Sequence, residues 1–416
     1  MLEEIRNNLN NPDKLEELYR TNKNEFRLAF LNNDFPSSNP DLLSFWKIRL
    51  NYNRDDVVIP TQKKSDFLPL IITCLITGIL INLTNFSDSI GRISYYMKFI
   101  SIIIFVMFSI YYLWTNEKLT KKNLIYVGLV SLVSGLYIFF LPFKESSHSV
   151  LLAYMHLPVL IWFLFGLLFS EFDYKKNAIN YIKFNGDMLI LIAVFLMTGI
   201  ILSVVSIQMF AVMGIHLEQY LIDYIAFWAV AVSPIIASYI IGNHKSITNK
   251  LAPAFARIFT PIVLIDLVVS LFIIIYKGLE IYQNRDFLLI FNIMLIVVMA
   301  IILFSFSEVR EFKRKGINEL FLTAIIIVAL IIDLIALSAI SYRLMEFGLS
   351  PNKITVLVTN ILIFFNLVLL LRDLFKLDFR NSDISIIFRT ISSYSVLYII
   401  WLIVVVFAFP FIFGMK

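Results

Sequence analysis

The stretch NELFLTAIIIVALIIDLIALSAI, residues 318–340, carries only two charged side chains, those of Glu319 and Asp333. A run of about 20 apolar residues is long enough for one helix to cross a hydrocarbon core about 30 Å thick. Its apolar residues follow one another without the alternation of a barrel strand, which favours a helix. Because a helix pairs its own backbone groups, it is stable in lipid. Residues 318–340 are therefore predicted to span a membrane.

Ten further stretches share this character, which predicts an all-α fold, a polytopic transmembrane helix bundle of about eleven spans. They are residues 67–86, 97–115, 124–142, 149–170, 187–213, 222–242, 254–277, 286–307, 352–372 and 394–414. The composition agrees, since 59% of the residues are hydrophobic and 16% are charged, whereas soluble domains carry about 25% charged residues. The predicted division is a helical segment at residues 1–66 and the bundle at residues 67–416.

Lysine and arginine residues set the predicted orientation. The even-numbered loops hold 16 of these residues, and the odd-numbered loops together with the C-terminus hold 8. Both counts include the ends of the neighbouring spans. Ten more precede the first span. The positive-inside rule places the N-terminus in the cytoplasm and, after eleven crossings, the C-terminus outside.

Residues 1–66 are predicted to form a cytoplasmic helical hairpin. Asn11-Pro12 is typical of a helix start, and apolar residues at helical spacing follow it up to Phe30. A second helix is expected from Asp41 to about Asn51, after a proline-containing turn. The hairpin is too small for a large core, so it is expected either to aid folding as a cap or to bind a cytoplasmic protein partner.

Several classes of function have no support in the sequence. The net charge of +5 follows from topology, and no basic stripe indicates a nucleic-acid partner. Cys74 is the single cysteine, which leaves no disulfide and no cysteine metal site. No phosphate-binding loop and no HExxH motif occurs, so neither a catalytic site nor a cofactor nor a metal is predicted. The lipid bilayer is the expected partner, and the oligomeric state stays open.

Four polar residues are predicted to share one depth in the membrane. Asp333, His156, Asn292 and Asn360 lie six to eight residues from the outer ends of their predicted spans. At about 1.5 Å per residue, Asp333 is expected roughly 10 Å below the outer surface. These side chains are predicted either to line a polar pocket, in which His156 and Asp333 exchange protons, or to act singly as hydrogen bonds between helices.

Asp266 and Arg257 are the other candidates, both in the seventh predicted span. A carboxylate at the middle of a bilayer needs a partner or a proton, which makes Asp266 a transport or proton-relay candidate. Arg257 is expected either to extend to the cytoplasmic interface or to form a buried ion pair. Pro261, Pro158 and Pro234 interrupt helical hydrogen bonding, and such kinks serve either a transport path or plain packing.

Three stretches carry a family resemblance: LAPAFARIFTP (251–261), NRDFLLIFN (284–292) and FGLSPNK (347–353). Together with LEELY (15–19), they resemble a bacterial family of multi-pass membrane proteins designated only as a domain of unknown function. The resemblance implies a bacterial plasma (inner) membrane protein and brings no activity with it.

The hypothesis favoured by these residues is a permease-like protein that moves a small solute or lipid without its own ATP hydrolysis. The alternative is a membrane sensor or scaffold that signals through residues 1–66. A membrane enzyme using Asp286 or Glu308 is the least favoured hypothesis, because no paired carboxylates with metal-ligand spacing occur.

Overall fold

The computed structural model describes residues 2–9, 11–31, 33, 35, 40–52, 67–85, 92–142, 146–212, 216, 218–243, 245–278, 285–308, 317–380 and 384–415. Within these ranges the secondary structure is helical and contains no strand, which confirms the predicted all-α class. The chain divides into two compact units, Met1–Asp66 and Phe67–Lys416.

The described residues of the first unit form four helices rather than the predicted two. They are α1 (Leu2–Asn7), α2 (Pro12–Thr21), α3 (Lys23–Leu31) and α4 (Pro40–Tyr52). Asn11 caps α2 as expected, because its side chain accepts a hydrogen bond from the amide of Lys14. The expected first helix is broken at Asn22, whose side chain accepts from the amide of Glu25 and so begins a new helix. The sequence pattern missed this break because apolar spacing continues across it.

A small apolar core holds the first unit together. Phe26 and Phe30 of α3 and Trp46 of α4 are buried against one another, with ring centroids 5.0–6.3 Å apart. Glu16 on α2 forms an ion pair of 2.8 Å with Arg49 on α4. These contacts join helices that are distant in sequence, so the unit has a core of its own.

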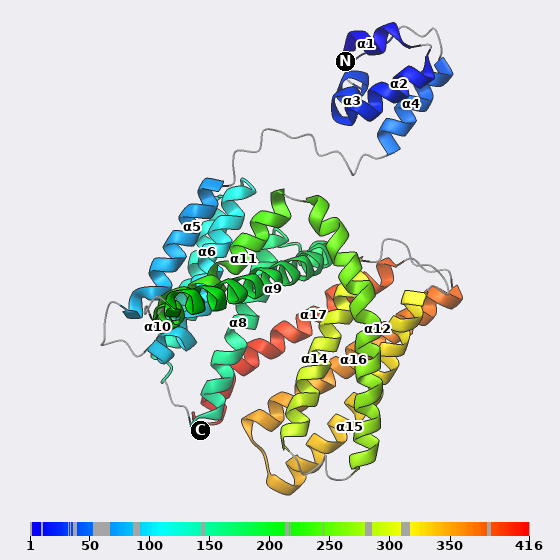
Figure 1. The fold of residues 1–416 in the computed structure, drawn as a ribbon. Coiled ribbons are helices and arrows are strands. Elements are labelled where there is room, and N and C mark those ends of the chain that lie inside the picture. The colour runs from blue at the N-terminus through cyan, green and yellow to red at the C-terminus, as the bar shows by residue number, and fades with distance from the viewer. Residues whose placement is uncertain are drawn as a thin grey trace. The chain divides into compact units, whose positions relative to one another are not determined.

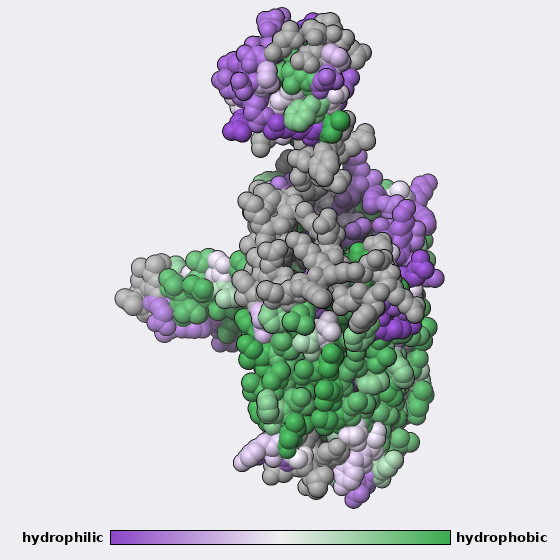
Figure 2. Space-filling view, turned by 90° about the vertical axis from the view of Figure 1, so that its right-hand side faces the viewer, coloured by the Kyte–Doolittle hydropathy of each residue, from purple (hydrophilic) through white to green (hydrophobic). Residues whose placement is uncertain are grey.

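The second unit contains eleven candidate membrane spans among the described residues. Their helices, in order, are α5 (Phe67–Ile81), α6 (Arg92–Thr115), α7 (Lys121–Phe140), α8 (His148–Phe169), α9 (Tyr174–Val212), α11 (Phe227–Asn243), α12 (Lys245–Lys277), α14 (Arg285–Glu308), α15 (Ile317–Phe347), α16 (Pro351–Arg380) and α17 (Ser385–Ile403). Short elements extend some of them, namely η1 (Asn82–Asn85), α10 (Glu218–Tyr220), η2 (Leu221–Ala226), η3 (Val404–Ala408) and α18 (Phe409–Ile412). The apolar residues form a broad band on the face drawn in Figure 2, as expected for a surface that faces lipid.

Two apolar clusters form the core of the bundle. The first joins α6, α7, α8, α9 and α11 with the end of the chain. The second joins α12, α14, α15 and α16 with the first half of α17. Figure 1 shows α17 running between these two groups of helices. Because α17 contributes Ile387 and Ile391 to one cluster and Leu402 to the other, it connects the two halves.

Candidate functional site

Asn292 and Asn360 meet inside the second half of the bundle. The side-chain amide of Asn360, on α16, donates to Oδ1 of Asn292, on α14, over 2.6 Å. Both side chains are buried. Asn292 lies seven residues from the start of α14, and Asn360 lies nine from the start of α16. The sequence placed the two at similar depth, and the structure brings them into contact.

Asp333 lies far from both ends of its helix. The helix α15 continues seven residues past Ile340 to Phe347, so fourteen residues, about 21 Å of helix, separate Asp333 from that end. The expected depth of about 10 Å was counted from the end of the apolar run, and the helix itself reaches farther. The apolar run ends at Ile340, but the helix does not, since polar residues continue a helix outside lipid as readily as apolar ones inside it.

The carboxylate of Asp333 is fully buried and has no hydrogen-bond partner at either oxygen. Moving such a group to the centre of a membrane helix costs about 2.5–3.5 kcal/mol on insertion scales, and more when it is unpaired. Packing alone would be served better by an apolar residue at this position. The unpaired carboxylate is thus the strongest functional feature of the bundle.

Asn366 lies at the level of Asp333 in the neighbouring helix. The turn at Gly348–Ser350 joins α15 and α16 as an antiparallel pair. Gly348 has a φ of +70°, a conformation that favours glycine, and Lys353 donates to the carbonyls of Phe347 and Gly348. Fourteen residues from the turn bring one helix to Asp333 and the other to Phe365, next to Asn366. Oδ1 of Asn366 is buried without a partner.

Tyr398 of α17 completes this group of polar side chains. Its hydroxyl accepts a hydrogen bond from the side-chain amide of Asn366 over 3.1 Å and donates to the carbonyl of Leu362 over 3.5 Å. Three helices thus contribute Asp333, Asn366 and Tyr398, which we call the Asp333 cluster. The three side-chain oxygens of the cluster that have no partner, two of Asp333 and one of Asn366, are acceptors, so each of them is suited to accept a hydrogen bond from a proton donor.

A polar seam runs along the interface between α16 and α17 on both sides of the cluster. On α16 it uses Thr359, the Leu362 carbonyl, Asn366 and Asp373, which are spaced on one helix face. From α17, the indole of Trp401 donates to Thr359, and the hydroxyl of Tyr394 donates to the Leu362 carbonyl over 2.8 Å. At the other end, Thr390 donates to Oδ2 of Asp373 over 2.5 Å.

Asp373 is fully buried but lies beside charged groups that reach the surface. Nε of Arg372 donates to Oδ1 of Asp373 over 3.0 Å. Lys376 lies 3.7 Å from the same oxygen, and the side chain of Arg372 is 52% exposed. This end of the seam is therefore in contact with the surface through two cations.

His156 and Asp266 do not join the cluster. Nδ1 of His156 lies 2.8 Å from the carbonyl of Leu152, one turn earlier in α8, and no contact of His156 with Asp333 occurs in the described ranges. Asp266 lies on the exposed face of α12, between Ile265 and Val269, which are also exposed. The predicted pocket shared by His156, Asp333 and the two asparagines is therefore not formed as one site.

The side chains of Arg257, Asp286 and Glu308 lie outside the described part of the structure. For the predicted kinks, the structure gives a packing role at Pro234. This residue cannot donate to the carbonyl of Val230, and the hydroxyl of Ser233 donates to that carbonyl instead over 2.8 Å.

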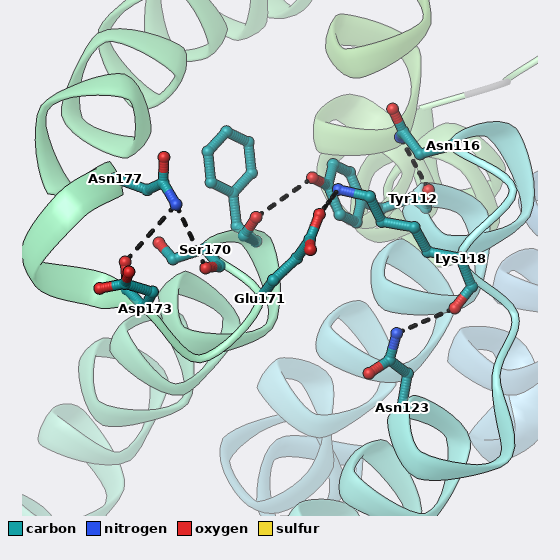
Figure 3. Close-up of polar contacts among 9 residues, drawn as sticks. Tyr112, Asn116, Lys118, Asn123, Ser170, Glu171, Asp173 and Asn177 are labelled. Atoms are coloured by element: carbon teal, nitrogen blue, oxygen red, sulfur yellow. Dashed lines mark hydrogen bonds and ion pairs between the residues drawn. The ribbon is translucent and has the colours of Figure 1, made fainter.

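A second polar group joins two turns at the ends of helices (Figure 3). Nζ of Lys118 lies 2.7 Å from Oε1 of Glu171, and Nζ of Lys122 lies 4.3 Å from the centre of the Phe172 ring. Burial acts to lower the pKa of Lys118, but the hydrogen bond that Lys118 donates to Glu171, together with its other interactions with Glu171 and Tyr112, outweighs burial, so the pKa is raised. The same contact lowers the pKa of Glu171. This group ties the α6–α7 turn to the α8–α9 turn.

Asn366, Tyr398 and Asp373 were not among the predicted site residues. A signal for them exists in the sequence, because residues 390–398, TISSYSVLY, contain six hydroxyl side chains within an apolar span. Hydroxyl side chains are common in membrane helices, and only the packing of α16 on α17 shows that Tyr398 contacts Asn366 and that Thr390 contacts Asp373. No group of three His, Cys, Asp or Glu side chains suited to hold a metal occurs among the residues the structure describes.

Comparisons of the chain with models of known protein families, with curated proteins and with solved structures found no match.

Proposed function

We propose that the protein is a permease-like transporter that moves a small solute or lipid across the bilayer without its own ATP hydrolysis. The observation that carries this proposal is the Asp333 carboxylate, which is buried at the middle of a span with both oxygens unpaired. Ionisable groups at such positions in membrane proteins mark substrate paths, ion paths and proton relays. Asp333 is the residue through which movement would be coupled to an ion.

The proposal includes a location and an orientation. The protein would lie in the plasma membrane of a bacterium, as the resemblance to the bacterial membrane family of unknown function implies. The Lys and Arg distribution places the first unit in the cytoplasm and the C-terminus outside. In this orientation Asp373 lies at the cytoplasmic end of the polar seam, and the contact between Asn292 and Asn360 lies toward the outside.

Complementation of a deletion strain tests the role of Asp333. Asp333→Asn should fail to restore any growth phenotype of the deletion, whereas Asp266→Asn, the matched change at an exposed carboxylate, should restore it. Membrane levels of both variants need to equal that of the unchanged protein. Full complementation by Asp333→Asn would reject this residue as the coupling group.

A second candidate function is a sensor or scaffold that signals through the first unit. The observation in its favour is the separate core of residues 1–66, together with Phe45 and Ile48, which are 54% and 67% exposed on α4. Deleting residues 1–66 should abolish function in this case while the spans still insert. Under the transport proposal, the same deletion should keep measurable activity.

A further inference from the structure

Four exposed lysines stand at the two turns of the bundle that the Lys118–Glu171 contact joins. Lys121 and Lys122 lie in the first turn of α7, and Lys175 and Lys176 lie in the first turn of α9. In the described part of the chain, no acidic side chain forms an ion pair with any of these four. Together they make a basic surface at one end of the helices, which we call the lysine surface.

Contacts between the two turns hold the lysine pairs on one surface. Lys118 of the α6–α7 turn points to Glu171 of the α8–α9 turn (Figure 3). The Phe172 ring packs edge-on against Tyr126 of α7, with ring centroids 5.0 Å apart, and Nζ of Lys122 lies 4.3 Å from its centre. The lysine pair of α9 begins three residues after Phe172. Two pairs that are distant in sequence therefore belong to one joined structure.

The lysine surface is expected at the boundary between lipid and water, because it lies at the ends of four candidate spans. Aromatic side chains typical of this boundary are close to it. Trp114 is exposed near the end of α6, and the hydroxyls of Tyr112 and Tyr126 donate to carbonyls near the end of α8. Leu119 and Phe172, on the turns themselves, are also exposed. The surface thus combines cations with apolar side chains, as surfaces in the headgroup layer do.

Lysines are not the residues that stabilise the first turn of a helix. This end of a helix carries a partial positive charge, so acidic side chains stabilise it and lysines oppose it. The first turns of α7 and α9 contain no acidic residue, and each contains two lysines. The positive-inside rule asks only for basic residues near the ends of the spans, whereas an anion bound at the lysine surface would be attracted by the lysines and by the helix ends together.

We propose that the lysine surface binds the headgroup of an anionic phospholipid. The ammonium groups attract the lipid phosphate, and the exposed Leu119 and Phe172 contact the acyl chains beside it. Clusters of roughly four to eight basic residues next to a span recognise anionic lipids in this way. The inference goes beyond the proposed function, because it uses no residue of the Asp333 cluster and holds whether or not a solute is moved.

Native mass spectrometry of the full chain in detergent, titrated with phosphatidylglycerol, tests the binding. Each lysine near a membrane surface contributes a factor of about five to the attraction of an anionic lipid, so Lys121→Gln/Lys122→Gln should bind about 25-fold more weakly. Lys121→Arg/Lys122→Arg keeps both charges and should bind like the unchanged protein. Arg6→Gln/Lys47→Gln removes two exposed charges from the first unit, and this matched control should leave the affinity unchanged.

Phosphatidylcholine and inorganic phosphate are the comparison probes. Phosphatidylcholine has no net charge and should bind more weakly, with no difference between the variants. Higher salt should weaken the binding of phosphatidylglycerol, because exposed charges are screened. Equal affinity of the unchanged protein and Lys121→Gln/Lys122→Gln for phosphatidylglycerol overturns the proposal. Inorganic phosphate that binds as tightly as the lipid, with the same dependence on the lysines, would show an ion site and overturns the lipid site.

Thermal unfolding separates lipid binding from folding. In phosphatidylcholine, Lys121→Gln/Lys122→Gln and Lys175→Gln/Lys176→Gln should unfold no earlier than the unchanged protein, because the removed lysines oppose the helix ends. Added phosphatidylglycerol should raise the unfolding temperature of the unchanged protein more than that of either variant, since a ligand stabilises the state that binds it. If Lys175→Gln/Lys176→Gln keeps the full affinity, the α8–α9 turn takes no part and the joint surface is rejected.

Discussion

At the scale of single residues, some buried polar side chains of the bundle are paired with each other and others have no hydrogen-bond partner. Asn292 and Asn360 pair with each other, as polar residues between membrane helices commonly do. Asp333 has no such partner at either oxygen. Because a paired amide is explained by packing and an unpaired carboxylate is not, Asp333 is the better functional candidate of the two kinds.

The asparagine pair should stabilise the bundle by a modest amount. Hydrogen bonds between membrane helices contribute about 0.6 kcal/mol on average and up to about 1.7 kcal/mol. A double-mutant cycle of Asn292→Ala and Asn360→Ala, followed by unfolding in mixed micelles, should give a coupling free energy of about 1 kcal/mol, since the 2.6 Å contact is short and buried. Strict additivity of the two changes would contradict a direct contact.

Glu16 should make the first unit sensitive to acid. A hydrogen bond from Arg20 lowers the pKa of Glu16, burial acts in the opposite direction, and Arg49 lowers the pKa further. The folded-state pKa therefore lies below the unfolded value of about 4.3. The stabilisation is complete above pH 4.3 and is lost as the pH falls through the folded pKa.

Glu16→Gln should accordingly lower the unfolding free energy of the first unit by about 1 kcal/mol at pH 7. The two proteins should become equally stable well below pH 4. Urea-dependent proteolysis of residues 1–52 in the full chain, followed over this pH range, measures the difference. Equal stability at pH 7 would show that the ion pairs with Arg20 and Arg49 contribute nothing.

At the scale of elements, the sequence predicted all the spans but not the lengths of their helices. An apolar run marks the part of a helix that lies in lipid, and this is why the eleven runs correspond to eleven candidate spans. The fifth begins at Tyr174 rather than 187, and the ninth reaches Phe347 rather than 340. The distance from Asp333 to the end of its helix is therefore longer than a count to the end of the apolar run gives.

The candidate site was predicted only in part, because hydropathy describes single spans and not the contacts between them. Asp333, Asn292 and Asn360 are recognisable from a single span, because each is a polar residue in an apolar run. Asn366 and Tyr398 can be recognised as a pair only once α16 is known to pack against α17. Which helices are neighbours in a bundle does not follow from hydropathy. The exposure of Asp266 could not be predicted from the sequence, because nearly all residues of its span are apolar and none shows which side is buried.

A tyrosine replaces the hydrogen bond that proline removes from the last span. Pro410 cannot donate to the carbonyl of Val406, four residues earlier, and the hydroxyl of Tyr137 donates to this carbonyl over 2.6 Å. Tyr137→Phe should therefore destabilise the bundle by about 1–2 kcal/mol, because a buried acceptor loses its donor. Thermal unfolding in detergent measures the change.

Tyr126→Phe is the matched control for this prediction. Tyr126 donates to the carbonyl of Leu164 over 2.9 Å, but that carbonyl also keeps its helical donor four residues later. The control should cost less than Tyr137→Phe. Equal losses in the two variants would show that the proline has no part in the effect.

At the scale of the whole molecule, eleven crossings would place the two chain ends on opposite sides of the membrane. The eleven candidate spans belong to one unit of the chain, and the lysines and arginines favour a cytoplasmic N-terminus. A fluorescent reporter that matures only in the cytoplasm should therefore be active when fused before residue 1 and inactive when fused after residue 416. A phosphatase that is active only outside should give the reverse pattern.

As an internal control, a phosphatase fused in the turn at 348–350 should be active and one fused at 118–120 should be inactive, because nine and two crossings precede these turns. Activity of the same reporter at both chain ends would require an even number of crossings, and it would contradict the predicted orientation.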